Sequence, residues 1–324
     1  MESVKSFRVM KNQTEINIID TFSYFDVFDY PLTLKELKLY LHYENLSKKV
    51  IKDKISDIPI IDNRLGYFFL KGREAIAVKR KMQEEISTRK RDIALNASLL
   101  LRRIPGVKLI GVSGSAAMNS SSENDDIDLF IITRRNTLWI VRAAVVILMK
   151  FFGIKREYKS KDNKNKFCLN MFLDEKYMDL SDKKSLYSAH EIVQLKVLYD
   201  KGSTFNKFIE NNHWINSYFP TISIKDKKNK TDKGQLESTL NNNKITKGIN
   251  LILFTLQFLY MYRKKTNEKV LYGKALFHPI DKSGYVMQEY GKRRSYYILL
   301  YNKLSDSKSC GFYSDYYKKL KLHN

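Results

Sequence analysis

Apolar residues recur at helical spacing in three successive segments at the start of the chain. EINIIDTFSYFDVFDY (15–30) predicts the first helix and PLTLKELKLYLH the second. Thr33 can cap the second helix, with Glu36 three residues later completing a capping box. SKKVIKDKISDI (47–58) predicts a third helix. The chain is therefore expected to begin with a group of short, capped helices.

A β-hairpin is predicted directly after these helices. IPIIDNRLGYFFLKG contains two short apolar runs joined around Asp62, Asn63 and Arg64. Three helices followed by a hairpin resemble a winged helix, so residues 1–75 are expected to form a winged-helix-like domain.

Four lysines on the third helix give this resemblance a possible function. If the module acts as winged helices often do, the helix can lie on nucleic acid. A packing or protein-docking role is the alternative, since no set of base-reading side chains is evident on one face. The lysines are Lys48, Lys49, Lys52 and Lys54.

The middle of the chain alternates strand and helix patterns. A long, charged helix at 74–103 is expected to link the modules through residues 76–103. This alternation predicts a mixed sheet in a central core at 104–184, and an α+β fold for the chain. The core elements are strands at 107–112, 127–133 and 166–174 and a helix around 137–152.

The C-terminal region, 185–324, is predicted to be helical, beginning with an amphipathic helix at 185–200. Residues 221–247 lack apolar periodicity and are expected to form a flexible basic segment. Residues 221–324 hold 21 Lys and Arg against 8 Asp and Glu, so the basic surface is concentrated in this part.

Two apolar stretches are predicted to be buried helices and not membrane spans. The first, 138–154, is interrupted by Arg142 and Lys150. The second, 249–262, is shorter than the roughly 20 residues that cross a bilayer. Because Arg, Lys and Lys follow it at 263–265, a membrane-surface or partner-docking role remains open for the second stretch.

The composition is that of a folded protein with a basic surface. Of its 324 residues 43% are hydrophobic, and the net charge of +23 favours polyanionic partners such as nucleic acid, nucleotides or acidic membranes. An AT-rich genome, which favours codons for Lys and Asn, would explain that charge equally well. Cys168 and Cys310 have no zinc-site spacing, and the N-terminus lacks the apolar core of a signal peptide, so a reducing, cytoplasmic setting is expected.

The candidate chemistry lies in SGSAAMNSSSENDDIDLFIIT (113–133). Alternate residues of a strand share a face, so Asp126 and Asp128 point the same way, with Cα atoms ~6–7 Å apart. Two such carboxylates repel each other unless a cation lies between them or one is protonated. Mg²⁺, which binds one or two carboxylates together with substrate phosphates, is the expected ion.

A turn precedes this acidic pair by a short distance. Gly114, between Ser113 and Ser115, lets the backbone approach a ligand closely, and the helix start that follows favours a phosphate. A phosphate-binding turn and metal-binding carboxylates would bracket a nucleoside triphosphate.

A Gly-Ser turn, ten intervening residues (116–125) and Asp-Ile-Asp opening an apolar strand resemble the signature of the polymerase-β-like nucleotidyltransferase superfamily. The resemblance covers residues 90–180. It implies that Ser113, Gly114 and Ser115 hold phosphates of the NTP. It also implies that Asp126 and Asp128 ligate Mg²⁺ ions, which align the α-phosphate with an attacking hydroxyl. A solvated strand start is the plain alternative, but it leaves the turn and its spacing unexplained.

The third carboxylate of that superfamily is missing where it is expected. The position between apolar residues on the later strand is Asn170, whose amide can bind a metal but cannot take a proton from a nucleophile. Asp174, on the same face, would lie ~13 Å from Asn170.

The weaker candidates lie outside the motif or at its end. They are His190 with Glu191, His278 with Asp281, and Arg134 with Arg135.

The sequence predicts a Mg²⁺-dependent nucleotidyltransferase that moves a nucleoside monophosphate to a hydroxyl of RNA, a small molecule or a protein, with an RNA or other polyanionic acceptor favoured. The alternative is a non-catalytic nucleotide- or nucleic-acid-binding module whose site lapsed at Asn170.

Overall fold

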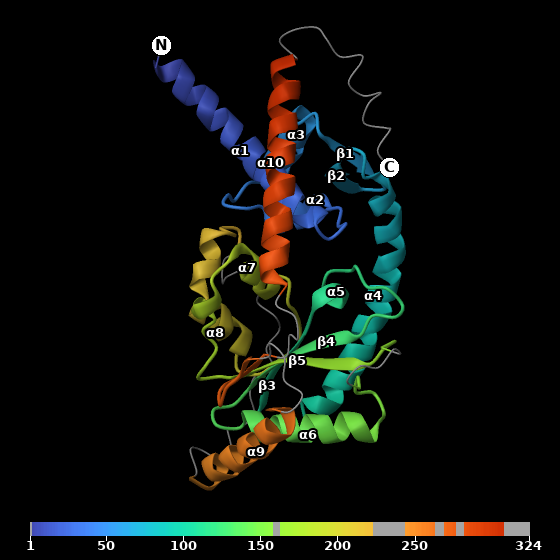
Figure 1. The fold of residues 1–324 in the computed structure, drawn as a ribbon, viewed down its shortest axis with the longest axis vertical. Coiled ribbons are helices and arrows are strands. Elements are labelled where there is room, and N and C mark those ends of the chain that lie inside the picture. The colour runs from blue at the N-terminus through green and yellow to red at the C-terminus, as the bar shows by residue number, and fades with distance from the viewer. Residues whose placement is uncertain (1, 158–162, 223–243, 263–268, 277–281, 308–324) are drawn as a thin grey trace. The chain divides into compact units, whose positions relative to one another are not determined.

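The computed structural model describes residues 2–157, 163–222, 244–262, 269–276 and 282–307. Helices and strands combine in an α+β fold, as expected (Figure 1). The chain divides into two compact units, each of which is built from separated stretches of sequence. The first comprises Met1–Lys79, Phe219–Thr221 and Gly284–Asn324, and the second comprises Arg80–Tyr218 and Ile222–Ser283.

The first unit combines helices with a small two-stranded sheet. The three predicted helices are present, but the first covers Glu2–Asp26 and so begins before, and ends before, the predicted 15–30. The elements are α1 (Glu2–Asp26), α2 (Leu34–Tyr40), α3 (Lys48–Asp57), β1 (Ile61–Arg64), β2 (Tyr67–Leu70) and α10 (Ser283–Ser307), with the first residues of α4 (Glu74–Leu101).

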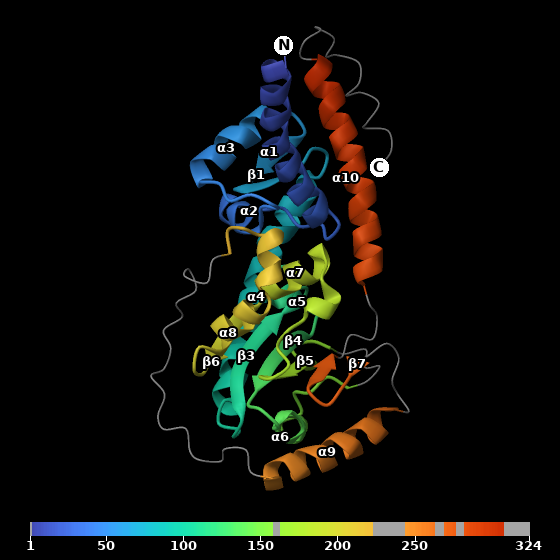
Figure 2. The ribbon, with the colours of Figure 1, turned by 90° about the vertical axis from the view of Figure 1, so that its left-hand side faces the viewer.

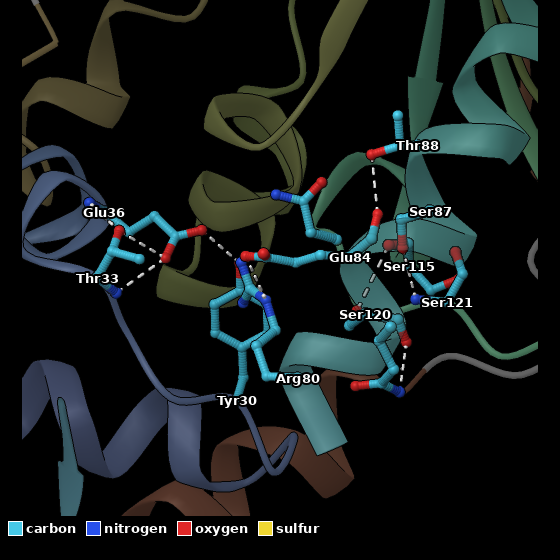
Figure 3. A network of polar contacts seen from close by, with 12 residues as sticks. Tyr30, Thr33, Glu36, Arg80, Glu84, Ser87, Thr88, Ser115, Ser120 and Ser121 are labelled. Atoms are coloured by element: carbon cyan, nitrogen blue, oxygen red, sulfur yellow. Dashed lines mark hydrogen bonds and ion pairs between the residues drawn. The ribbon is translucent and has the colours of Figure 1, made fainter. Parts of the chain in front are cut away.

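The predicted capping box at the start of α2 is confirmed. The Thr33 Oγ1 accepts a hydrogen bond from the Glu36 backbone N–H at 3.2 Å, and the Glu36 carboxylate accepts one from the Thr33 N–H at 2.9 Å (Figure 3). Each side chain thus satisfies a backbone donor that the helix itself leaves open.

The hairpin is present, but its turn lies elsewhere than predicted. Arg64 pairs with Tyr67, so Asp62, Asn63 and Arg64 belong to β1. The two turn residues are Leu65 and Gly66, both with positive φ, at +56° and +82°. A two-residue turn of this hand matches the twist of the strands, and Gly66 adopts it without steric cost.

Helix α10, which is remote in sequence, packs on α1 through ion pairs whose carboxylates are buried and whose arginines are partly exposed. The Asp20 carboxylate lies 2.6 Å from the Arg294 guanidinium, and Asp26 binds both Arg293 and Arg73. The rings of Tyr24 and Tyr290 lie 5.8 Å apart beside these pairs. The N-terminal helices therefore obtain part of their core from residues near the other end of the chain.

A buried histidine makes the stability of this unit sensitive to acid. His42 is inaccessible to solvent, and its ring lies against those of Tyr24, Phe219 and Tyr290. Burial lowers the pKa of His42 from 6.5 to about 3. Below pH 6.5 the unfolded chain therefore binds a proton that the folded chain does not.

We expect His42→Phe to reduce the acid sensitivity of folding. The native free energy of unfolding should fall by about 1.4 kcal/mol between about pH 7.5 and about pH 5.5 through His42 alone. Phenylalanine keeps the aromatic packing and removes the titration. Chemical denaturation at both pH values measures the difference, and an unchanged pH dependence in the variant would rule out His42 as its source.

The second unit is built on a six-stranded mixed sheet with the strand order β6-β3-β4-β5-β8-β7 (Figure 2). β4 and β5 run parallel, and the other neighbours run antiparallel. The predicted central strands are confirmed. The strands are β3 (Val107–Ser113), β4 (Ile127–Thr133), β5 (Phe167–Asp174), β6 (Lys196–Asp200), β7 (Lys269–Val270) and β8 (Lys274–Leu276).

Helices cover both faces of this sheet. Ala94 and Leu101 of α4 and Trp139 of α6 (Leu138–Phe151) join one apolar cluster with three residues of β4, which are Ile127, Leu129 and Ile131. On the other face, the ring of Phe208, in α8 (Thr204–Asn211), lies 5.3 Å from that of Phe130. The remaining elements are α5 (Gly114–Ala117), η1 (Ser181–Lys183), α7 (Leu186–Val193), η2 (His213–Ser217) and α9 (Lys244–Tyr262).

The helix predicted at 185–200 is wrong in its second half. α7 ends at Val193, and Lys196–Asp200 form the edge strand β6, which pairs antiparallel with β3. Backbone pairing with an open sheet edge outweighs the helical spacing of so short an apolar run. The region 185–324 contains helices α7 to α10, together with three strands that complete the sheet.

The flexible segment predicted at 221–247 lies largely outside the described residues, at 223–243. Its last residues, Lys244 to Lys247, form the first turn of α9, so the prediction of a loop is wrong there. None of the described helices is long and apolar enough to cross a membrane.

The burial predicted for the two apolar helices holds for α6 in part and fails for α9. Trp139 and Val141 of α6 are fully buried, although Ile147 is 68% exposed. α9 packs on α6, where Asn250 Oδ1 accepts the Trp139 N–H at 2.9 Å, but its opposite face is exposed. Both faces of α9 are apolar, and the core covers one of them.

Candidate functional site

The turn after β3 is shaped by a glycine that no other residue could replace without strain. Gly114 has φ +63°, and a Cβ added to it would lie 2.7 Å from the Asp128 Oδ2. In the sheet Ser113 is the direct partner of Asp128. Gly114 therefore allows the turn to pass against the carboxylate of β4.

The structure brings the two predicted aspartates together. Asp128 is the second residue of β4, and Asp126 immediately precedes the strand. One ligand atom from each aspartate and the Cys168 Sγ all lie within 4.8 Å of one another. Cys168 is the parallel partner of Asp128 on β5. These side chains form the acidic site.

Arg156 balances part of the negative charge at this site. Its guanidinium donates a hydrogen bond to the Asp126 Oδ2 and forms an ion pair with it. Arg156 is positioned by its backbone N–H, which donates to the Phe167 carbonyl at 3.0 Å beside the start of β5. Repulsion between the two aspartates is thus reduced by an arginine that the sequence motif does not predict.

The environment of Asp128 disfavours its ionised form. Burial raises the pKa of Asp128 to about 7, and the negative charge of Asp126 contributes in the same direction. A hydrogen bond with the Cys168 thiol and the charge of Arg156 act in the opposite direction. A divalent cation beside both aspartates would favour the ionised form.

The Cys168 thiol remains protonated in this setting. Burial raises the pKa of Cys168, and the charges of Asp128 and Asp126 raise it further. The thiol is therefore a hydrogen-bond partner of Asp128 and not a nucleophile.

The loop between the turn and the aspartates is held by its own serines. The Ser115 Oγ lies 3.1 Å from both the Asp125 carboxylate and the Ser121 Oγ, and the Ser122 N–H donates to Asp125 at 2.8 Å. The hydroxyl of Ser115 thus has structural partners, and its contact with a phosphate stays a prediction.

Helix α4 braces the same loop from outside. The Ser121 N–H donates to the Ser87 Oγ at 2.9 Å, and the Gln83 side chain donates to the Ser120 carbonyl at 2.9 Å (Figure 3). The Lys90 ammonium, 1% exposed as a residue, donates to the carbonyls of Asp125 at 2.6 Å and Glu123 at 3.1 Å. The position of Asp126 therefore depends on a helix well before it in the sequence.

We expect Lys90→Met to destabilise the protein by about 2 kcal/mol, because it leaves the carbonyls of Glu123 and Asp125 without the ammonium that donates to both. Lys81→Met, at an exposed position of the same helix, is the matched control and should change stability by less than about 0.5 kcal/mol. Urea denaturation compares the two variants. Equal, small effects would mean that water replaces the ammonium at no cost.

Of the two candidates for the third acidic position, Asn170 lies in the middle of β5 and Asp174 at its end. Asn170 faces the site, and its amide donates to the Ser113 Oγ at 3.4 Å. Asp174 is the partner of Thr133 at the far end of β4, where it accepts backbone hydrogen bonds from Asn136 at 2.6 Å and Lys176 at 2.9 Å. Asp174 therefore holds a turn and does not approach the aspartate pair.

Among the weaker candidates, Glu191 acts electrostatically on the site. Burial raises the pKa of Glu191 to about 7, and its charge raises the pKa of Asp128. His190 is buried, with its Nδ1 3.3 Å from the Gln194 side-chain nitrogen.

The other weaker candidates are not placed at the site. Arg134 and Arg135 follow β4 at the end opposite Asp128, and the Arg135 N–H donates to Glu175. His278 and Asp281 lie outside the described residues.

Comparison with known proteins does not assign the chain to a family. No family model, no curated protein and no solved structure matches it.

Proposed function

We propose that the protein is a Mg²⁺-dependent nucleotidyltransferase, which transfers a nucleoside monophosphate from an NTP to a hydroxyl acceptor and releases pyrophosphate. The observation that carries this proposal is the pair Asp126 and Asp128, held against the close turn at Gly114. A mixed sheet with this pair at the start of a strand supports the proposed resemblance to polymerase-β-like nucleotidyltransferases.

The donor set fits a hard divalent ion. Two carboxylates with ligand atoms within 4.8 Å offer the oxygens that Mg²⁺ prefers, and substrate phosphates complete such a site. When bound, Mg²⁺ neutralises charge on the phosphates at the transition state. Asp126 and Asp128 would hold it, and the turn at Gly114 gives the phosphates close access to the backbone.

In the proposed reaction the acceptor oxygen attacks the α-phosphorus, and the bond from that phosphorus to the bridging oxygen of the β-phosphate breaks. The hydroxyl proton must pass to a base or to water. Asn170 cannot accept it, and Asp174 is at the wrong end of the sheet. Water or Glu191, the further carboxylate whose charge acts on Asp128, would take this proton.

The test is incubation of the full chain with each labelled NTP and Mg²⁺ in the presence of RNA or cell extract. Transfer of label to an acceptor, lost on addition of EDTA, is the expected result. Absence of transfer with all four nucleotides would overturn the proposal of an enzyme.

A nucleotide-binding module without transferase activity is the second candidate, and Asn170 favours it. The amide occupies the position of the third carboxylate and is tied to Ser113. NTP binding in titrations, without label transfer under any condition, would support this candidate.

We also propose that the N-terminal unit binds RNA or DNA in the manner of a winged helix. Lys48, Lys49 and Lys52 of α3 are exposed, whereas Lys54 forms an ion pair with Glu15 at 3.4 Å. We expect Lys48→Ala/Lys52→Ala to weaken the binding of RNA or DNA. The slope of log K against log salt concentration should fall by about 2, because two lysines no longer neutralise phosphates. Lys54→Ala is the control. Salt-insensitive binding would indicate a docking module instead.

A further inference from the structure

The outward face of α9 carries a continuous stripe of aliphatic side chains. These residues recur every three or four positions along the helix, and each is between 47% and 66% exposed. We call them the α9 stripe: Ile245, Ile249, Ile252, Leu256 and Leu259. An exposed apolar surface of this extent on a folded protein marks a binding surface.

The opposite face of α9 is firmly attached to the second unit. The ring of Phe254 lies 5.1 Å from that of Trp139, and the Gln257 amide donates to the Trp139 carbonyl at 2.9 Å. Asn250 accepts the backbone N–H of Trp139. The stripe is therefore presented to the outside by contacts that fix the rotation of the helix about its axis.

The charged residues of α9 and of its neighbour α6 are all positive. Neither helix contains an Asp or a Glu, and their charged residues are Arg142, Lys150, Lys244 and Lys247. Tyr260 and Tyr262, at the end of α9, are 65% and 66% exposed. Aliphatic residues combined with lysines and tyrosines are typical of a helix that lies in the headgroup region of a membrane.

We propose that the α9 stripe binds the surface of an anionic phospholipid membrane, with α9 parallel to the bilayer plane. The exposed Lys150, Lys244 and Lys247 favour negatively charged headgroups, and the stripe enters the boundary between headgroups and acyl chains. A second copy of the chain is the poorer occupant, because its own charge of +23 opposes association.

The test is co-sedimentation of the full chain, without nucleotide, with vesicles of phosphatidylcholine containing phosphatidylserine and with vesicles of phosphatidylcholine alone. We expect binding to the first and at least about tenfold weaker binding to the second. Ile252→Ser/Leu256→Ser should reduce binding by at least about tenfold. Leu95→Ser/Leu299→Ser, at two exposed positions on α4 and α10, is the matched control and should bind as the native chain does.

Equal binding to both kinds of vesicle, or equal binding by the stripe variant, would overturn the proposal. So would dimerisation in solution that the stripe variant abolishes. Because no nucleotide is present, these outcomes are independent of whether the acidic site transfers nucleotides.

Discussion

Asp128→Asn should abolish nucleotide transfer and yet make the protein more stable at about pH 8. Loss of one metal ligand is expected to reduce transfer by at least about 10³-fold. The pKa of Asp128 is raised from 3.8 to about 7 in the folded protein. Between these pH values the unfolded chain releases this proton and the folded chain keeps it, so the free energy of unfolding falls as the pH rises. Removing the charge should therefore raise the free energy of unfolding by about 1–2 kcal/mol, after allowance for partial exposure of the side chain. Label transfer and urea denaturation measure the two effects.

Asp125→Asn is the matched control in the same loop. The Asp125 carboxylate accepts hydrogen bonds from the Ser122 N–H and from the hydroxyls of Ser115 and Ser122, so this change should lower stability by about 1 kcal/mol. Addition of Mg²⁺ should stabilise the native protein against heat and leave Asp128→Asn unaffected. If both variants lose stability equally, Asp128 carries no electrostatic cost. If Mg²⁺ does not stabilise the native protein, the acidic site is not a metal site of the proposed kind.

Gly114→Ala should both destabilise the second unit and disturb the acidic site. The new Cβ would lie 2.7 Å from the Asp128 Oδ2 in a backbone conformation with φ +63°. The turn or the carboxylate must move, so we expect a loss of about 2–3 kcal/mol of stability and at least about tenfold weaker Mg²⁺ binding. Denaturation and metal titration by calorimetry provide the two measurements.

Gly202→Ala distinguishes the effect of backbone strain from that of the clash with Asp128. Gly202 has φ +66°, and no atom lies within 4 Å of the position that a Cβ would take, so this variant carries the backbone strain without the clash. It should lose about 1 kcal/mol and leave Mg²⁺ binding unchanged. Similar losses in both variants would show that the contact with Asp128 relaxes at no cost.

Local signals in the sequence were sufficient for much of the fold. The Thr33 and Glu36 capping box, the strand with Asp128 and the helix α6 each depend on residues within a few positions of one another. The edge strand β6 was missed because its strand character comes from pairing with β3, far earlier in the chain, where Gly111 is the partner of Val197. No pattern within residues 196–200 contains that partner.

The acidic site shows the same division between local and distant information. The Asp126 and Asp128 pair and the glycine turn lie within one short motif. Arg156 reaches Asp126 because α6 leads the chain back to the start of β5, and no spacing rule specifies that ion pair. Cys168 could have been found, because it lies two positions before Asn170 on a strand that the sequence does predict, and residues two positions apart share a face of a strand.

The late strand β8 has a consequence for dissecting the molecule. β8 pairs with β5 at Met171, Phe172 and Leu173, although it lies far later in the chain. A fragment that ends at Tyr218 would contain the whole acidic site and yet leave β5 as an unpaired, apolar edge. Such an edge readily adds a strand from another molecule. Fragments intended to isolate the chemistry must therefore extend through Leu276 to keep this edge of β5 paired.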